Sequence, residues 1–204
     1  MLKEQIENVK LTVVYYSSTG TNYELAKTAA EHAEKLGAEV RLRKAPELAP
    51  QEAIDQNEAW KNHLEQTASI PEASPDDMEW ANAFILGTPT RFGNASAQLK
   101  NFMDSLGGLW FQGKLADKAA AAFTSAANPH GGQESTLLAL YNSFHHWGVI
   151  PVAPGYTDQS VFESGGNPYG LSVTAGGEQI PDEKKKVLRH LTHRLVSVAD
   201  RLAE

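Results

Sequence analysis

The chain has 204 residues, of which 41% are hydrophobic and 21% charged, and 18 Lys and Arg against 25 Asp and Glu give a formal charge of −7. This length suits one globular domain, and the acidic balance excludes the basic surface that nucleic-acid binding requires. The absence of cysteine excludes disulfides, thiolate metal sites, iron–sulfur clusters and cysteine nucleophiles. Because the opening MLKEQIENVK contains no apolar signal segment and no stretch approaches the roughly 20 apolar residues of a spanning helix, we expect a cytoplasmic protein without a membrane span.

The start of the chain predicts a strand, a helix and a second strand. Residues 10–16, KLTVVYY, form a short apolar run typical of a buried strand, and 17–22, SSTGTN, predict the turn that follows it. Apolar and alanine residues then recur at helical spacing over 23–36, which predicts an amphipathic helix. Residues 38–43 alternate with a period of two, so we expect a second strand near a sheet edge.

An insertion interrupts this alternation. Residues 44–78 are rich in Pro, Glu, Gln and Ala, and the stretch 51–66 within them predicts one mostly polar surface helix. Beyond the insertion, strands and helices resume until an extended loop over 154–180, rich in Gly, Pro and Tyr. The other expected strands are 83–87, 118–123 and 149–152, and the other expected helical segments are 78–81, 95–106, a helix that ends at Trp147, and 182–203.

Strands that alternate with helices predict an α/β fold with a doubly wound parallel sheet. The short gaps between elements argue against a second domain, so residues 1–204 are expected to form one. In such sheets, ligands bind outside the carboxyl ends of the strands. Three loops leave those ends, at 17–22, 88–94 and 124–132.

The loop 17–22 offers hydroxyl and backbone N–H groups at the start of a helix, which suits a bound phosphate. It lacks the lysine of a nucleotide-hydrolase phosphate loop and the three glycines of a dinucleotide-binding fingerprint. It also lacks the acidic residues of a phosphoacceptor and the cysteine of a phosphatase. A phosphomonoester that is held and not hydrolysed remains, beside the alternative of a Ser/Thr-rich helix cap that binds nothing.

Five segments, taken in order, resemble the signature blocks of the WrbA family of FMN-dependent NAD(P)H:quinone oxidoreductases, in the flavodoxin-like superfamily. They are YSSTGTN at 16–22, GTPTRFGN at 87–94, GGLWFQGK at 107–114, FTSAANPHGGQE at 123–134 and HWGVIPVAPGY at 146–156. The resemblance implies a flavodoxin-like five-stranded parallel sheet in the order 2-1-3-4-5, with helices on both faces. It also implies bound FMN, NADH or NADPH as the reductant, and a homotetramer.

The resemblance assigns FMN contacts residue by residue. Phosphate contacts would come from Ser17, Ser18, Thr19, Gly20, Thr21 and Asn22. Contacts to the ribityl chain and the ring edge would come from Pro89, Thr90, Arg91, Phe92, Gly93 and Asn94. The other side of the flavin would be flanked by Ser125, Ala126, Ala127, Asn128, His130 and Gly131, with His146 as a further contact. His130 has the alternative of only shaping its loop.

A substrate box is also expected. Trp110 and Phe92 offer apolar faces, and His146 and Tyr156 offer hydrogen-bond donors, for a flat quinone or nicotinamide stacked on the flavin. The resemblance places Trp110 and His146 there, across subunit boundaries; from the residues alone, Trp110 is also typical of a core or an interface. No metal site is expected, because the neighbouring His145 and His146 diverge by about 100° on a helix.

These expectations combine into one function. The resemblance implies that FMN takes a hydride from NAD(P)H at its N5 atom and that a quinone or similar planar acceptor then takes two electrons in one step, with ping-pong kinetics. Two alternatives stay open. One is a flavodoxin-type electron carrier that docks to protein partners, and the other is an azo, nitro or flavin reductase on the same fold.

Overall fold

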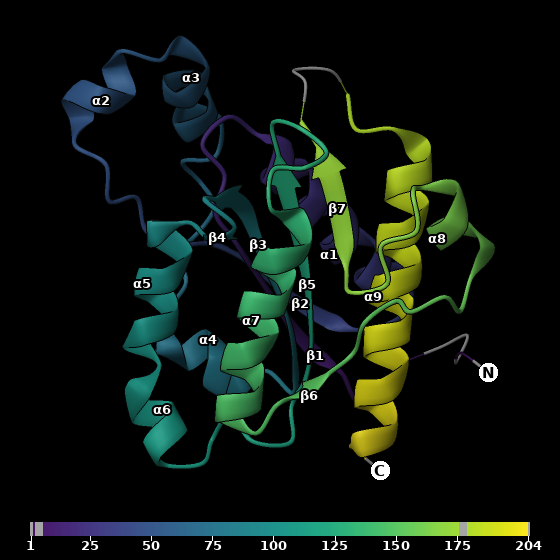
Figure 1. Cartoon of the computed structure of the whole chain (residues 1–204). Helices are drawn as coiled ribbons and strands as arrows, with labels where there is room; N and C mark the ends of the chain where they lie inside the picture. Colours follow the sequence, from purple (N-terminus) through teal and green to yellow (C-terminus); the bar gives the residue numbers. More distant parts are fainter. Residues whose placement is uncertain (1, 3–5, 176–178, 204) are drawn as a thin grey trace.

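The computed structural model describes residues 2, 6–175 and 179–203. A parallel sheet with the order β2-β1-β3-β5-β6 runs through its centre (Figure 1). The predicted order 2-1-3-4-5 is confirmed, because β5 and β6 are the fourth and fifth parallel strands of this path. The strands are β1 (Lys10–Tyr15), β2 (Glu39–Lys44), β3 (Ala83–Arg91), β5 (Ala119–Ala126) and β6 (Ile150–Pro151).

Two short strands join this sheet where only loops were expected. β4 (Asn94–Ala95) turns back and pairs antiparallel with β3, and β7 (Leu171–Thr174) pairs with the second half of β5. Since β6 pairs only with the first two residues of β5, the edge strand is split in two around residues 152–170. The segment 154–180, expected to be one extended loop, contains β7 and the helix α8 (Gln159–Glu163), so that expectation was wrong for these two stretches. Four residues between glycine-rich turns are too few to show strand periodicity.

Helices cover both faces of the sheet, as Figure 1 shows. α1 (Thr21–Lys35) and α9 (Asp182–Leu202) pack on one face, against Leu11, Val13 and Ile85. On the other face, α4 (Pro75–Trp80), α5 (Ala97–Ser105) and α7 (Gln133–Trp147) pack against Val14 and Leu86, and α6 (Gly107–Phe111) follows α5. Successive side chains of β1 and β3 thus enter opposite cores, which is why apolar residues follow one another without alternation at 13–15 in β1 and at 83–86 in β3.

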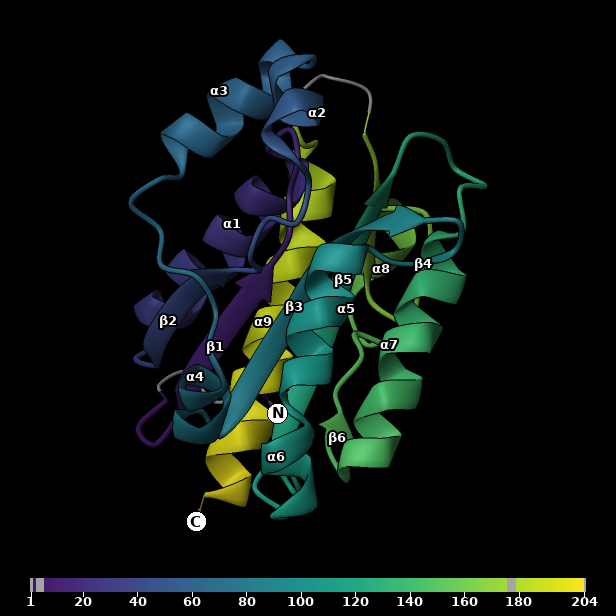
Figure 2. The same ribbon diagram turned by 90° about the vertical axis from the view of Figure 1, so that its left-hand side faces the viewer.

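The insertion forms two helices at the carboxyl ends of the strands. α2 (Gln51–Asp55) and α3 (Glu58–Gln66) lie beyond the end of β1 (Figure 2). The single helix predicted over 51–66 was wrong, because Asn57 adopts an extended conformation and its side chain accepts a hydrogen bond from Trp60 N–H. An asparagine with this geometry begins a new helix. In the part of the chain that the structure describes, no helix is both long and apolar enough to cross a bilayer.

Candidate functional site

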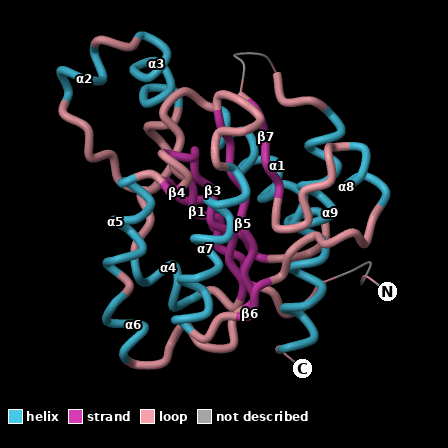
Figure 3. The backbone as a smooth tube through the Cα atoms, viewed as in Figure 1, coloured by secondary structure: helices cyan, strands magenta, loops and turns pink. Residues whose placement is uncertain are grey.

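The loops that follow β1, β3 and β5 lie at one end of the sheet (Figure 3) and enclose a pocket of about 1000 Å³. Most of the residues expected to contact FMN line this pocket. They are Ser17, Ser18, Thr19, Gly20, Thr21, Asn22, Pro89, Thr90, Arg91, Ser125, Ala126, Ala127, Asn128 and Gly131. Further walls come from Tyr23 and Glu24 of α1, from Ala59, Asn62, His63 and Gln66 of α3, and from Ala175, Gln179 and Ile180.

The loop after β1 forms a cradle at the start of α1. Gly20 is the N-cap residue with a φ of 106°, a left-handed conformation that favours glycine, and no side chain caps the helix there. Its own N–H donates to Ser17 Oγ at 3.0 Å. The next N–H groups have no partner within the helix, and they face a pocket at the positive end of the helix dipole. This arrangement suits a phosphate group.

Asn22 joins this cradle to the end of β5. Its side chain is 2% exposed, and its Nδ2 donates to Ser125 Oγ at 3.0 Å. Its Oδ1 is buried without a hydrogen-bond partner among the described residues. A buried polar atom of this kind is costly unless a ligand or water pairs with it. The open cradle and the unpaired amide oxygen together fit a ligand with a phosphate and hydroxyl groups, as FMN has.

The loop after β3 is a hairpin seated on α7. Phe92 and Gly93, with φ values of 53° and 76°, form the two-residue turn between β3 and β4. Thr90 Oγ1 donates to Gly132 O at 3.3 Å, and Ser135 Oγ donates to Gly93 O at 3.1 Å. The Phe92 ring is fully exposed at the tip, and Phe92, Gly93 and Asn94 lie outside the lining of the pocket.

Formal charges are few on the described pocket wall. Arg91 supplies one positive charge there, and its guanidinium donates to the carbonyl of Thr90 at 3.2 Å. Glu24 of α1 supplies a negative charge. An anion would therefore be held mainly by backbone N–H groups and the helix dipole, with Arg91 placed to favour negative charge that develops on a bound ring.

Glu47 fixes the insertion against the end of β1. Its carboxylate accepts hydrogen bonds from Tyr16 OH at 2.9 Å, Trp60 Nε1 at 3.1 Å and Gln98 Nε2 at 2.8 Å. Burial acts to raise the pKa of Glu47, but the hydrogen bonds from Gln98, from Tyr16 and from two backbone N–H groups outweigh it and lower the pKa. Because Tyr16 directly precedes the cradle and Trp60 lies on α3, the ionised carboxylate holds two pocket walls together.

His63 is one of the lining residues that sequence reasoning missed. The polar composition of 51–66 suggested a surface helix, yet His63 is 5% exposed and lies above Gly20. A signal was present, because Trp60, His63, Leu64 and Thr67 recur at helical spacing and form the inward face of α3.

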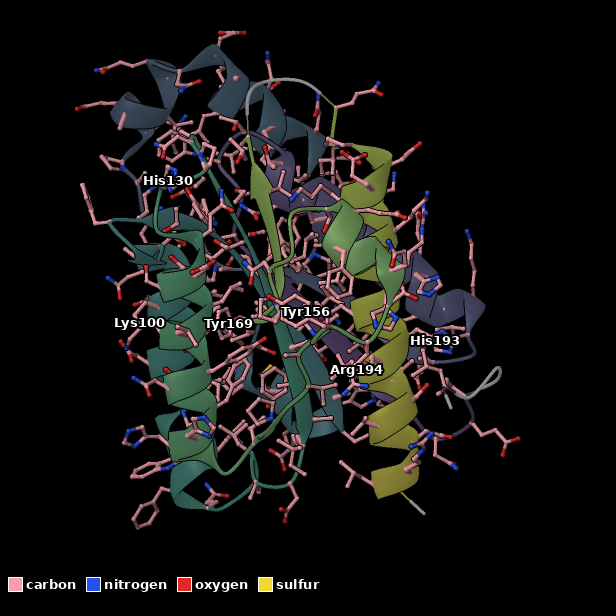
Figure 4. All side chains as sticks on the ribbon, turned by 45° about the vertical axis from the view of Figure 1, so that its right-hand side comes forward. Lys100, His130, Tyr156, Tyr169, His193 and Arg194 are labelled. Atoms are coloured by element: carbon pink, nitrogen blue, oxygen red, sulfur yellow. The ribbon has the colours of Figure 1, made fainter. Side chains whose placement is uncertain are left out.

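The remaining predicted residues lie apart from the pocket in a single chain. His130 is exposed on the loop after β5 (Figure 4). Trp110 and His146 contact each other, through Trp110 Nε1 and the His146 carbonyl at 2.9 Å, at the amino ends of the strands. Tyr156 stacks on Phe162, with ring centroids 5.1 Å apart, in the segment between β6 and β7. One chain alone does not assemble the expected substrate box.

The chain is similar to known proteins over most of its length. The family model described as "NADPH-dependent FMN reductase" matches residues 9–159. The chain belongs to this family. It is 51% identical over 194 residues to "NAD(P)H dehydrogenase (quinone)" of Deinococcus radiodurans, which covers 95% of this chain and 97% of that one. A protein of the same name from Aromatoleum aromaticum is 41% identical over 175 residues, 83% of this chain and 84% of its own.

Solved structures support the fold of this family member. "The crystal structure of the flavodoxin, WrbA-like protein from Agrobacterium tumefaciens" superposes with a TM-score of 0.67 at 23% identity, covering 95% of this chain and 99% of that one. A flavodoxin "from the domain Archaea" superposes with a TM-score of 0.61 at 15% identity, covering 96% and 99%. The flavodoxin-like fold is confirmed. Together with the relatives named above, these matches confirm the resemblance that the five sequence blocks indicated.

Proposed function

We propose that this protein is an FMN-dependent oxidoreductase that uses NADH or NADPH to reduce quinones to hydroquinones by two electrons. The observation that carries the proposal is the cradle at the start of α1, with the unpaired amide oxygen of Asn22 beside it, in a chain of this family. The two curated relatives described above are named for NAD(P)H and quinone. The proposal combines the ligand that fits this pocket, FMN, with the activity that the names of those relatives describe.

Each pocket wall has a task in this reaction. Bound FMN supplies the redox centre that accepts a hydride from NAD(P)H and delivers two electrons to the quinone. The backbone N–H groups after Gly20 bind the phosphate, and Asn22 and Thr90 bind the polar chain that connects phosphate and ring. Arg91, which lines the same pocket, would favour negative charge on a bound flavin ring. Ser125 to Asn128 enclose the opposite side.

The substrate box is proposed to form between chains. Phe92 is fully exposed and Trp110 is 51% exposed, so both present apolar faces to a partner. We propose a homotetramer in which Trp110 and His146 of one subunit complete the pocket of another, with Tyr156 as a further donor. Residues 1–204 are proposed to act as one domain, in the cytoplasm.

Steady-state kinetics tests this proposal. The protein is loaded with FMN, desalted, and assayed for oxidation of NADH and NADPH at several concentrations of benzoquinone. We expect oxidation that requires both FMN and quinone and gives parallel double-reciprocal lines, the pattern of ping-pong kinetics. FMN that stays bound without any quinone-dependent oxidation would favour the electron carrier. Loss of FMN on desalting would favour a loop that binds nothing.

A further inference from the structure

Helix α3 brings one histidine over the phosphate cradle. His63 is 5% exposed, and its Nδ1 would lie 3.7 Å from a Cβ atom built on Gly20. Its ring packs on Tyr23, with centroids 5.6 Å apart. Among residues 2, 6–175 and 179–203, neither ring nitrogen makes a hydrogen bond. His63 is therefore a buried polar side chain without a hydrogen-bond partner, facing the place where an anion is expected.

The surroundings of His63 favour the uncharged form of its ring when the pocket holds no anion. Burial, and then the ammonium of Lys44, lower the pKa of His63. The charged and titratable groups around it come from β1, α1, β2 and the insertion. They are Tyr15, Tyr16, Tyr23, Glu24, Lys44, Glu47 and Glu72. None of these makes a hydrogen bond to the ring in the part of the chain that the structure describes.

We propose that His63 is a phosphate-binding residue, which donates a ring N–H to the FMN phosphate and so lets the pocket select FMN over riboflavin. This inference rests on the proposed function, because it assumes that FMN binds in the cradle. The inference gives the insertion a function beyond forming one wall of the pocket. The loop after β1 binds the phosphate from below through backbone groups, and α3 adds a side chain that can also carry charge.

The chemistry makes this contact dependent on pH. A phosphate monoester carries close to two negative charges above its second pKa of about 6. Such a charge beside an imidazole favours the imidazolium, so FMN binding raises the pKa of His63 and takes up a proton. The contribution of His63 to FMN affinity is therefore larger in mildly acidic than in mildly basic solution. Riboflavin, which has no phosphate, gains nothing from it.

The first test compares dissociation constants from the quenching of flavin fluorescence, for FMN and riboflavin, at about pH 6 and about pH 8.5. The variants are His63→Leu, which has no donor, and His63→Gln, which keeps a donor without a titratable charge. His145→Gln, at the exposed far end of α7, is the matched control. Ratios between variant and wild type at one pH cancel the titration of the phosphate itself.

We expect His63→Leu to weaken FMN binding by about tenfold to a hundredfold, with riboflavin binding unchanged. We expect His63→Gln to weaken FMN binding by about tenfold at pH 6 and by at most about threefold at pH 8.5. An equal loss for FMN and riboflavin, or a His63→Gln ratio that is the same at both pH values, would overturn the inference. If the wild type binds FMN and all variants match it, this inference fails while the proposed function stands.

A second measurement keeps the inference testable should a variant fold poorly. In the wild-type protein, the imidazole Cε1 proton of His63 is followed by NMR through a pH titration, with and without FMN. We expect its pKa to rise when FMN is present and to stay unchanged with riboflavin. A pKa that FMN leaves unchanged would contradict a contact between His63 and the phosphate. Failure of the wild type to bind FMN at all would instead overturn the proposed function on which this inference rests.

Discussion

Two helices of this protein begin in the same way and serve different purposes. α1 and α7 both start at a glycine in the left-handed conformation, Gly20 and Gly132, and neither has a side-chain cap. The start of α1 is open, since a Cβ at Gly20 would meet only His63 Nδ1 within 4 Å among the described residues. The start of α7 is covered, since a Cβ at Gly132 would lie 2.7 Å from Gly93 Cα. Similar local geometry can serve as an anion site only where the tertiary structure leaves the helix start uncovered.

Asn22→Asp is the variant expected to impair anion binding at the open start of α1 most strongly. It places a carboxylate beside the open helix start, where it repels a phosphate. The amide of Asn22 donates to Ser125 Oγ, and the carboxylate would instead accept a hydrogen bond from that hydroxyl. We expect the dissociation constant for FMN to rise by about a hundredfold, and that for riboflavin to change little. Isothermal titration calorimetry would measure both.

Asn57→Asp is the matched control for Asn22→Asp. It adds the same charge at the start of α3 and keeps the oxygen that caps Trp60 N–H. Equal weakening of FMN binding by the two variants would show that net charge, and not the cradle, governs binding.

Substituting each of the two glycines by alanine tests how closely the chain packs against each helix start. Both variants force a left-handed alanine, which costs about 1 kcal/mol. Gly132→Ala also drives a methyl group into the backbone of Gly93, so we expect its free energy of unfolding to fall by about 3 kcal/mol, against about 1 kcal/mol for Gly20→Ala. Urea denaturation measures both values. Equal losses would mean that the hairpin does not press on α7.

Glu47→Gln is expected to loosen the attachment of α3, which lines the same pocket as the start of α1. The amide offers one acceptor oxygen in place of two, so some of the donors from Tyr16, Trp60 and Gln98 lose their partner. We expect a loss of about 1–2 kcal/mol in the free energy of unfolding and weaker FMN binding. Because the pKa of Glu47 is lowered in the folded state, this stability is present above the ordinary carboxyl pKa and is lost as the pH falls through the folded value.

The control for Glu47→Gln is Glu52→Gln on the exposed side of α2. Its unfolding free energy should stay within about 0.5 kcal/mol of wild type. A wild type and a Glu47→Gln variant with the same loss of stability on acidification would contradict an ionised, hydrogen-bonded Glu47.

Trp110→Ala addresses a region far from both helix starts. Because Trp110 lies at the amino ends of the strands, we expect the affinity for FMN to stay unchanged. If a neighbouring subunit brings Trp110 to the pocket, the KM for benzoquinone rises by about fivefold to tenfold. An unchanged KM in a protein that elutes as a tetramer would exclude Trp110 from the substrate box.

The sequence predicted what depends on local periodicity and on chain order. The apolar run 10–16 and the helix after it follow from patterns within single segments. The order of the five parallel strands was implied by the resemblance of the five sequence blocks to a known family, and the structure confirms it. Most of the cradle also followed, because parallel strands bring their carboxyl ends together. The split of the edge strand into β6 and β7 could not be predicted, because β7 is too short to show a strand pattern.

The burial of His63 could not be predicted from the composition of its segment. It depends on where the insertion folds, which is decided by Glu47 joining Trp60 to Tyr16 across parts of the chain far apart in sequence. Phe92 shows the reverse case, since a motif predicted a contact residue and the single chain leaves the ring exposed at the hairpin tip. Contacts that another subunit would supply leave no trace in a helix or strand pattern.

The most direct test of the central claim is an anaerobic absorbance experiment on the FMN-loaded, desalted protein. NADH or NADPH is added first, and benzoquinone second. We predict that the flavin band stays with the protein, bleaches with the nicotinamide and returns with one equivalent of benzoquinone per flavin. A flavin that only a strong chemical reductant bleaches would contradict the account and indicate an electron carrier.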